Sequence, residues 1–473
     1  MNAINLSPRE KALTINLDTR TYGSFAEIGA GQETAAWFFK AGAASGTIAK
    51  TISAYDKSMS DAIYGTEESG RYVVESRVVK MLNREYNILE QRLDAVRPPD
   101  NLFFAFANSV VALNYNKTNE GHGWLGIRFQ LHPDTPPNDA IVHIRLLDND
   151  TLLQQQAAGI VGVNLIYSAF YYYDTIETFL HSLVESLGTE RVEIDMVRIT
   201  GPDFQHLDNR LLSLKLVKLG LTQAALFGPE GNVLQPSEVF YKKNILVLRG
   251  RFRPCTFVNL DMIKTGLEHF KNDKQVDVNK IICISEININ SLTSDGQMIN
   301  IDEEEFIDRA EILCSLGHTV MISNYHKYYK LVSYLSRFSK QKIGLVLGIM
   351  SLSEIFNEQY YTDLKGGILE SFSTLFSKNI KLYIYPARDV HSKELLTCKN
   401  FRLPENLVYL YKYLLANDKL EDIVNARLDF LDIFSDNVIR MIKAGESGWE
   451  KMVPKEVSEA IIRKQLFDYC PKN

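Results

Sequence analysis

The sequence predicts an α/β protein whose main domain is built on a mostly parallel sheet. Short apolar runs rich in β-branched or aromatic residues recur between residues 162 and 386. Amphipathic stretches with a helical period separate these runs, which is typical of βαβ units around a sheet that is buried on both faces. Eight such strands fit an open doubly wound sheet, and they also fit a (β/α)8-like barrel.

The first 150 residues predict an α+β region. A helix is expected to begin at Ser7-Pro8-Arg9-Glu10, which combines an N-cap residue, a proline at the first helical position and a capping glutamate. Residues 1–95 are expected to be mainly helical, and the longest amphipathic stretch spans 71–96. Three β-rich segments then follow, separated by turn-forming loops, and they predict an antiparallel sheet.

The parallel α/β domain is expected over residues 151–394, and a helical region over residues 395–473. Strands are predicted at 162–170, 192–200, 223–228, 244–250, 280–287, 318–323, 342–349 and 380–386. The C-terminal region is expected to contain helices over 405–418, 420–434, 436–445 and 454–469, which are suited to packing or self-association.

Composition restricts the classes of function. The net charge of −6 provides no basic field, so no nucleic-acid partner is predicted. No apolar run approaches the ~18 residues of a membrane span. Charged residues 9–11 interrupt any signal-peptide core, and five widely spaced cysteines indicate a reducing compartment. We therefore expect a cytoplasmic protein with no membrane partner.

An arginine cluster follows the predicted strand at 244–250. Arg249, Arg251 and Arg253 alternate with other residues, so an extended backbone would direct all three guanidiniums to one side. Arginine suits bidentate binding of phosphate, and ligands meet the carboxyl ends of strands in parallel α/β folds. The alternative is internal pairing of these arginines with acids such as Asp261 or Glu286.

Further candidates lie at the ends of later strands. Glu286 and His326 are the candidate acid–base residues, and Asn324 is a polar group beside His326. Gly366 and Gly367 precede an apolar helix and present backbone amides that suit an anion. Their alternative roles are ion pairing for Glu286, a surface position or capping for His326 and turn formation for the glycines.

Other patterns predict no site. His122, His132 and His143 lack a recognised ligand spacing, so no metal site is predicted, and no cofactor is identified. The glycine-rich segment GAGQET has Gly29 and Gly31 but Thr34 in place of the third glycine of the dinucleotide-binding pattern. We interpret it as a turn that leads into a helix.

Several segments together resemble a broad bacterial protein family. They are TYGSFAEIGAGQETAAWFFKAG, GTIAKTISAYDKSMSDAIYG, GHGWLGIRFQLHP, GIVGVNLIYSAFY, LRGRFRPCTFVNLDM and GWEKMVP. Members of this family commonly carry the automatic name nicotinate-nucleotide adenylyltransferase or TonB-dependent receptor. The chain has neither the HxGH and ISSTxxR motifs of the first class nor the signal peptide and strand pattern of the second.

The residues therefore support two hypotheses from different classes. In the first, the protein binds a phosphorylated small molecule, such as a nucleotide, through the three arginines, and handles it as a nucleotide- or sugar-phosphate transferase. In the second, it is a noncatalytic scaffold that self-assembles into a homo-oligomer through its helical ends, with the arginines in salt bridges.

Overall fold

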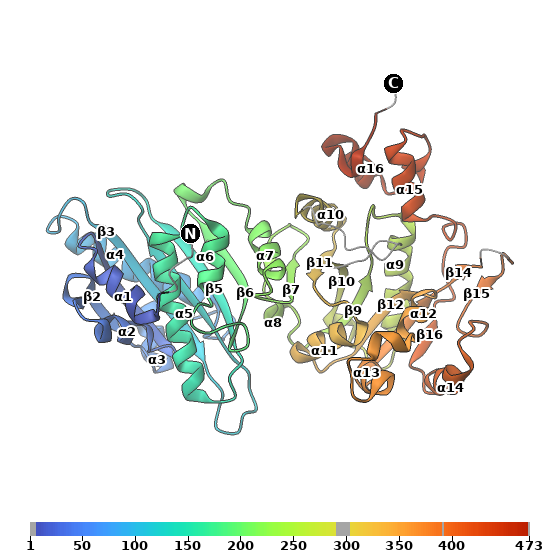
Figure 1. Ribbon diagram of the computed structural model, residues 1–473, viewed down its shortest axis with the longest axis horizontal. Helices are drawn as coiled ribbons and strands as arrows, with labels where there is room; N and C mark the ends of the chain where they lie inside the picture. The colour runs from blue at the N-terminus through green and yellow to red at the C-terminus, as the bar shows by residue number, and fades with distance from the viewer. Residues whose placement is uncertain (1–5, 290–302, 390–391, 472–473) are drawn as a thin grey trace. The chain divides into compact units, whose positions relative to one another are not determined.

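The computed structural model describes residues 6–289, 303–389 and 392–471 (Figure 1). The chain divides into two compact units, Met1–Gln223 and Ala224–Asn473. Residues 151–223, which were expected in the parallel domain, thus belong to the N-terminal unit. The expected divisions at 150 and 394 both fall inside a unit.

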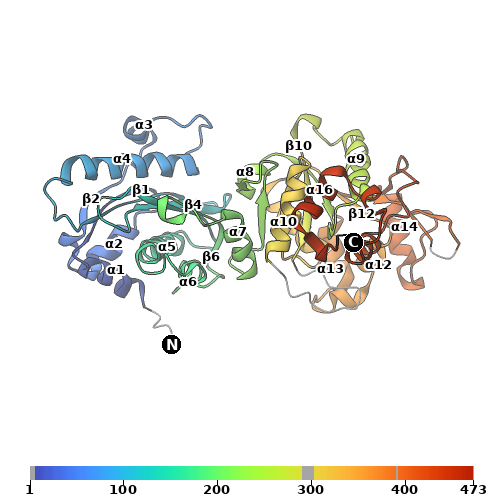
Figure 2. The same ribbon diagram turned by 90° about the horizontal axis from the view of Figure 1, so that it is seen from above.

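The N-terminal unit is an α/β/α sandwich. Its helices are α1 (Pro8–Leu17), α2 (Thr34–Ala41), α3 (Lys57–Tyr64), α4 (Glu75–Leu93), α5 (Thr151–Tyr171), α6 (Ile176–Ser182) and α7 (Asn209–Lys218). Its strands are β1 (Thr21–Gly29), β2 (Ile48–Ile52), β3 (Leu102–Val111), β4 (Gly121–Phe129), β5 (Asn138–Leu146) and β6 (Val192–Thr200). Figure 2 shows α3 and α4 on one face of the sheet, and α1, α2, α5 and α6 on the other.

The six-stranded sheet of this unit is mixed. Its order is β2-β1-β3-β4-β5-β6, in which β2, β1 and β3 are parallel and β3 to β6 are antiparallel. The predicted antiparallel meander is therefore present as β3, β4 and β5. The predictions missed β1 and β2 and assigned β6 to the parallel domain, because its pairing with β5 is a long-range property.

The predicted start of the first helix is confirmed. The Ser7 side chain accepts a hydrogen bond from the Glu10 amide, and the Glu10 carboxylate accepts one from the Ser7 amide at 2.8 Å. In contrast, the strand predicted at 162–170 is wrong, since these residues lie within α5. An apolar run that is buried on all sides has no helical stripe, so its composition cannot be distinguished from that of a buried strand.

The C-terminal unit contains a second, larger sheet. Its strands are β7 (Ala224–Phe227), β8 (Val233–Leu234), β9 (Asn244–Arg249), β10 (Ile281–Asn288), β11 (Thr319–Ser323), β12 (Ile343–Gly348), β13 (Ile380–Tyr385) and β16 (Leu420–Asp422), and β14 (Ala387–Arg388) pairs separately with β15 (Leu395–Leu396). Its helices are α8 (Pro236–Val239), α9 (Phe257–Asn272), α10 (Glu303–Ser315), α11 (Tyr328–Phe338), α12 (Ser351–Ile355), α13 (Gly367–Leu375), α14 (Val408–Ala416), α15 (Ser435–Lys443) and α16 (Lys455–Lys464).

This sheet confirms the mostly parallel α/β prediction. The order is β16-β13-β12-β9-β10-β11-β7-β8, and the six strands from β16 to β11 are parallel. Because the sheet is open, the barrel alternative is wrong. β7 runs antiparallel to β11, so the strand predicted at 223–228 exists but is not part of the parallel set. Within the expected helix at 420–434, residues 420–422 instead form β16.

Helices cover both faces of the parallel strands. Gly266 brings α9 close to Val346 of β12, where an added Cβ would lie 2.4 Å from a Val346 methyl group. The opposite face packs against α11 and α13 through a core that includes Val247, Leu331 and Phe372. Among the described helices, none is long and apolar enough to cross a membrane.

Candidate functional site at the carboxyl edge of the second sheet

The strand order alone indicates where ligands bind in sheets of this type. When the parallel strands are numbered in chain order, β9 is the first and β12 the fourth, and the sheet order becomes 3-2-1-4-5-6. This is the order of the Rossmann fold, in which ligands bind outside the carboxyl ends of strands one and four, where the connections diverge. The loop that follows β9 contains the arginine cluster and lies at this switch point.

Arg249 is fixed inside the unit. Its Nε donates to Glu286 Oε2 at 2.6 Å and its Nη2 to Glu286 Oε1 at 2.9 Å. The Tyr328 ring lies 4.7 Å from the guanidinium, and the backbone carbonyl of His326 accepts from its Nη1. Burial opposes the charged form, but the Glu286 carboxylate raises the pKa of Arg249 above its ordinary value. Arg249 is therefore paired internally with Glu286, as the alternative to phosphate binding had predicted.

Glu286 likewise has partners within the unit. It is fully buried, and it accepts from the Ser323 hydroxyl as well as from Arg249. The lone pairs of a carboxylate that accepts from a bidentate guanidinium and a hydroxyl are directed at these donors. This geometry favours a structural role for Glu286 over the predicted acid–base role.

Arg251 and Arg253 diverge from Arg249. Phe252 between them has a φ of 46° and a buried ring, so the chain turns and the extended geometry assumed from the sequence does not occur. Arg251 Nη2 donates to both oxygens of Asp436, at 3.0 and 2.9 Å, and this pair is largely exposed. Arg253 Nε lies 2.7 Å from Glu305 Oε1.

Arg309, which the sequence analysis did not single out, lies beside Arg251 and Arg253. Arg309 of α10 is buried, donates to the Arg251 carbonyl at 2.9 Å, and approaches the Glu305 carboxylate to 3.6 Å. Burial lowers the pKa of Arg309 to about 10, and the charges of Arg253 and Arg251 contribute to this. Among the described residues, the guanidiniums of Arg251, Arg253 and Arg309 share two carboxylates in direct ion pairs, those of Asp436 and Glu305.

The C-terminal segment packs over the same loop. The Phe257 amide at the start of α9 donates to the Met452 carbonyl at 3.1 Å, and the Phe257 ring stacks on Phe430 at 5.5 Å. Asp436 of α15 supplies the carboxylate for Arg251. The predicted helical appendage therefore contributes residues to the switch point, which its sequence alone did not indicate.

The remaining predicted residues lie at two places. Asn324 and His326 follow β11, and His326 is exposed. Burial of part of its ring and the charge of Arg249 lower the pKa of His326, so its imidazole is neutral near pH 7. Gly366 and Gly367 lie at the start of α13, where the Gly366 amide donates to Glu370 Oε2 at 2.8 Å and the Gly367 amide to the Leu364 carbonyl. These amides are occupied within the chain.

The glycine-rich segment of the N-terminal unit connects the end of β1 to the start of α2. Glu27 of β1 accepts a hydrogen bond from the Thr34 amide at 3.0 Å, so its carboxylate lies where a helix would otherwise bind an anion. Gly31 has no room for a side chain, since an added Cβ would lie 2.1 Å from Asn108 Oδ1. Burial, opposed by the Thr34 and Ala35 donors, raises the pKa of Glu27 to about 7.

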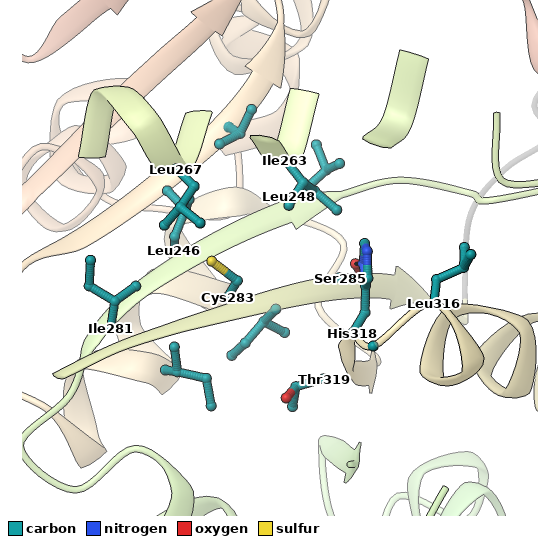
Figure 3. A pocket seen from close by; sticks show the side chains of 14 residues that line it. Leu246, Leu248, Ile263, Leu267, Ile281, Cys283, Ser285, Leu316, His318 and Thr319 are labelled. Atoms are coloured by element: carbon teal, nitrogen blue, oxygen red, sulfur yellow. Dashed lines mark hydrogen bonds between the residues drawn. The ribbon is translucent and has the colours of Figure 1, made fainter. Parts of the chain in front are cut away.

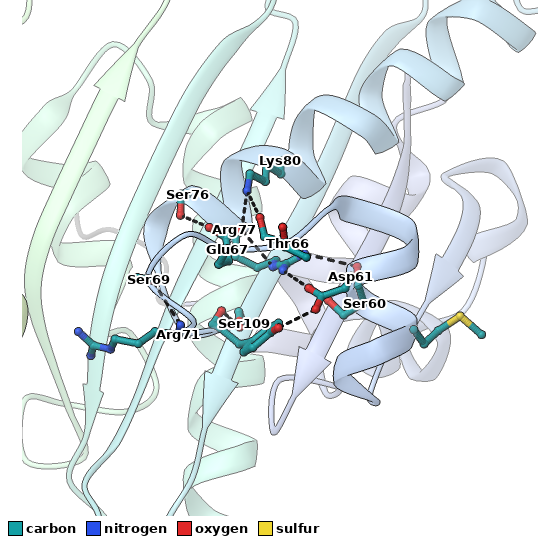
Figure 4. A network of polar contacts seen from close by, with 12 residues as sticks. Ser60, Asp61, Thr66, Glu67, Ser69, Arg71, Ser76, Arg77, Lys80 and Ser109 are labelled. Atoms are coloured by element: carbon teal, nitrogen blue, oxygen red, sulfur yellow. Dashed lines mark hydrogen bonds and ion pairs between the residues drawn. The ribbon is translucent and has the colours of Figure 1, made fainter.

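A polar network stabilises α3 and α4 of this unit (Figure 4). Arg77 is fully buried, and its Nη2 donates to Asp61 Oδ1 at 2.9 Å while its Nε lies 3.3 Å from Glu67 Oε1. Lys80 donates to the same Glu67 oxygen at 3.0 Å, and its side chain is 40% exposed. The network joins two helices and the loop between them.

Two of the three histidines in the meander form a chain of hydrogen bonds. His143 Nδ1 lies 2.5 Å from Asp195 Oδ1, and His143 Nε2 lies 3.1 Å from His122 Nδ1. Because a carboxylate only accepts, the His143 Nδ1–H donates to it. Burial and the neighbouring His143 lower the pKa of His122 to about 4. In the described part of the chain, no three His, Cys, Asp or Glu residues form an arrangement that could hold a metal ion.

Comparisons with known proteins identify no family. No protein-family profile matches the chain, and no curated protein is significantly similar to it. Solved structures with partial similarity include a nicotinic acid mononucleotide adenylyltransferase of Plasmodium falciparum, at 12% identity over 48% of this chain and 98% of that chain, with a TM-score of 0.31.

Two others are competence-damage proteins. The protein CihA of Agrobacterium tumefaciens aligns at 14% identity over 36% of this chain and 98% of its own, with a TM-score of 0.26. A CinA superfamily protein of Enterobacter cloacae aligns at 14% identity over 35% and 92%, with a TM-score of 0.26. At these TM-scores the similarities carry no argument about fold or function.

Proposed function

We propose that the C-terminal unit binds a phosphorylated small molecule, such as a nucleotide, at the carboxyl edge of its sheet between β9 and β12. The observation that carries this proposal is the position of Arg251, Arg253 and Arg309 around the first βα loop of a sheet with the Rossmann order. Among the described residues these three guanidiniums have two carboxylates in direct ion pairs, so a phosphate group would add negative charge and further acceptor oxygens.

Arg251 differs from Arg249 in the ion pair that a ligand would have to break. The Arg251–Asp436 pair is exposed on both sides, at 44% and 68% of the side-chain area. Exposed ion pairs contribute only about 0–1 kcal/mol, so a phosphate can replace Asp436 at small cost. Arg249, held by buried Glu286, is retained as part of the fold.

The proposed reaction class is phosphate-group or nucleotidyl transfer, in which arginines stabilise the charge that develops on phosphate. His326 is the remaining acid–base candidate, since it is exposed just after β11 and its backbone carbonyl accepts a hydrogen bond from Arg249. The adenylyltransferase name carried by the family that the sequence resembles is compatible with this ligand class. All five cysteines are free, which supports the proposed cytoplasmic location.

Thermal unfolding with added ATP or inorganic pyrophosphate tests the proposal. A ligand at 100 times its Kd stabilises the folded protein by about 2.7 kcal/mol, which raises the Tm by several degrees. Arg251→Ala should abolish this rise and leave the Tm of the protein alone almost unchanged. Arg20→Ala is the control, because Arg20 is also an exposed arginine, at 57% of its side-chain area, and its ion pair with Asp18 lies in the N-terminal unit.

Two results would count against the proposal. The Tm of the wild-type protein could be insensitive to every phosphorylated compound, or Arg251→Ala and Arg20→Ala could respond alike. In the second case the ligand binds at another place.

Self-assembly is the second candidate function, and one surface favours it. Tyr409 and Tyr413 lie one turn apart on α14 and are 81% and 63% exposed. Exposed apolar side chains at helical spacing suit contact with a second copy. Light scattering of the wild-type protein and of Tyr409→Glu tests this: an oligomer that the substitution dissociates supports it, and a monomer contradicts it.

A further inference from the structure

A cavity of about 480 Å3 lies over β10, on the face of the sheet that α9 covers (Figure 3). Leu246 and Leu248 of β9 form one side, and Ile263 and Leu267 of α9 lie above them. The volume is within the roughly 300–1,000 Å3 that is typical of small-molecule sites. The walls are mainly aliphatic.

The packing of the helices creates this space. Gly266 and the contact of Phe270 with Tyr383 hold α9 over β12 and β13, on one side of β10. On the other side, Gly317 has a φ of 84° and turns the chain from α10 into β11. The first three residues of β10 are only half-buried, although strands of parallel sheets are usually covered on both faces.

Polar groups gather at one part of the cavity. Ser285 Oγ and His318 Nδ1 lie 2.8 Å apart, and Ser285 is 1% exposed. Burial lowers the pKa of His318, so its ring is neutral at pH 7. Burial also raises the pKa of the Cys283 thiol, which lines the same strand face, to about 11. Of the described residues that line the cavity, none is Asp, Glu, Lys or Arg.

We infer that this cavity binds an uncharged small molecule with an aliphatic chain and a hydrogen-bonding end group, such as a long-chain alcohol. The chain would lie against Leu246, Leu248 and Leu267, and the end group would bond to the Ser285–His318 pair. No described lining residue would pair with an ionised end group at the Ser285–His318 pair, and burial of an unpaired charge is strongly unfavourable.

This site is separate from the proposed phosphate site. Ser285 and Glu286 are neighbours on β10, so their side chains point to opposite faces of the sheet. Glu286 holds Arg249 on the face packed against α11, whereas Ser285 opens into the cavity under α9. Loss of one site therefore does not predict loss of the other.

Protection of Cys283 from alkylation tests the inference in the full chain. Cys255, Cys314 and Cys398 are buried and Cys470 is exposed, so Cys470→Ser leaves Cys283 as the accessible thiol. N-ethylmaleimide labelling at this residue, followed by peptide mass spectrometry, should slow at least fivefold in saturating 1-octanol. Apparent affinity should rise about fourfold for each methylene from 1-hexanol to 1-octanol, the increment expected for burial of a CH2 group.

Two variants sharpen the test. Ser285→Ala should weaken 1-octanol by about three- to tenfold, the effect of one neutral hydrogen bond, and keep the dependence on chain length. Cys283→Phe should fill the cavity and abolish the rise in Tm that 1-octanol causes. Alcohols that neither slow labelling nor raise the Tm, or that act independently of chain length, would overturn the inference, and the labelling result decides even if Cys283→Phe fails to fold.

Discussion

Arg77 of the N-terminal unit and Arg251 of the C-terminal unit are both paired with carboxylates, but their surroundings differ. Arg77 is fully buried between Asp61 and Glu67. Arg251 is 44% exposed and pairs with Asp436, whose side chain is 68% exposed. The first arrangement holds helices together, whereas the second leaves a cation and its partner within reach of a ligand.

The two units also differ at the places where each could bind an anion, which are the start of α2 and the arginines of the loop after β9. In the N-terminal unit, Glu27 supplies a carboxylate to the start of α2. At the switch point of the C-terminal unit, Arg253 and Arg309 both form direct ion pairs with Glu305, the one carboxylate they share among the described residues. A cluster of charges is thus informative about function only when its internal partners have been counted.

The largest expected loss of stability is that of the Arg77→Ala variant. Arg77→Ala leaves two carboxylates in a buried network without their guanidinium, and we expect a loss of about 3–5 kcal/mol in the free energy of unfolding. Urea denaturation, followed by tryptophan fluorescence in a Trp449→Phe background, reports on this unit through Trp37 and Trp124. Lys80→Ala is the control, because Lys80 bonds the same Glu67 from a partly exposed position and should cost under about 1 kcal/mol. Equal losses for both variants would contradict a structural role specific to Arg77.

The next effect depends on pH and concerns Glu27. Its pKa is about 7 in the folded protein and 4.5 in the unfolded chain, so the folded state binds this proton more tightly. The stabilisation from protonation is fully present below pH 4.5 and is lost as the pH rises through 7, a change of about 3 kcal/mol. Glu27→Gln removes it. The free energy of unfolding of the wild type relative to this variant should therefore fall between pH 4.5 and pH 8, and a constant difference would contradict the assignment.

The smallest effect on stability is expected for Arg251→Ala. Its ion pair is exposed, so we expect a loss of less than about 1 kcal/mol in the free energy of unfolding. Urea denaturation beside Arg77→Ala gives a direct comparison of the two arginines. A loss for Arg251→Ala as large as that for Arg77→Ala would show that both are structural, and the contrast between the units would fail.

Local patterns in the sequence were sufficient for several elements. The capping box at Ser7 and the β-branched runs of β9 to β13 could be recognised because they depend on residues close in the chain. The 162–170 segment could not, since a fully buried helix and a buried strand have similar composition. The strand order also depends on pairing between distant segments, and it was the strand order that located the site.

The candidate site was predictable only in part. The arginines of the β9–α9 loop were recognised from their spacing, but their partners were not. Arg251 pairs with a residue 185 positions away and Arg253 with one 52 positions away. The turn at Phe252 was equally hidden, because a positive φ at a bulky residue is imposed by tertiary packing.

The most direct test of the phosphate site uses the carboxylate that competes with the ligand. Calorimetric titration of inorganic pyrophosphate into wild-type protein and Asp436→Asn compares the two Kd values at equal salt concentration. If Arg251 is released to bind phosphate, removing the Asp436 charge should tighten pyrophosphate binding several-fold. Equal Kd values, or no binding in either protein, would contradict the proposed site.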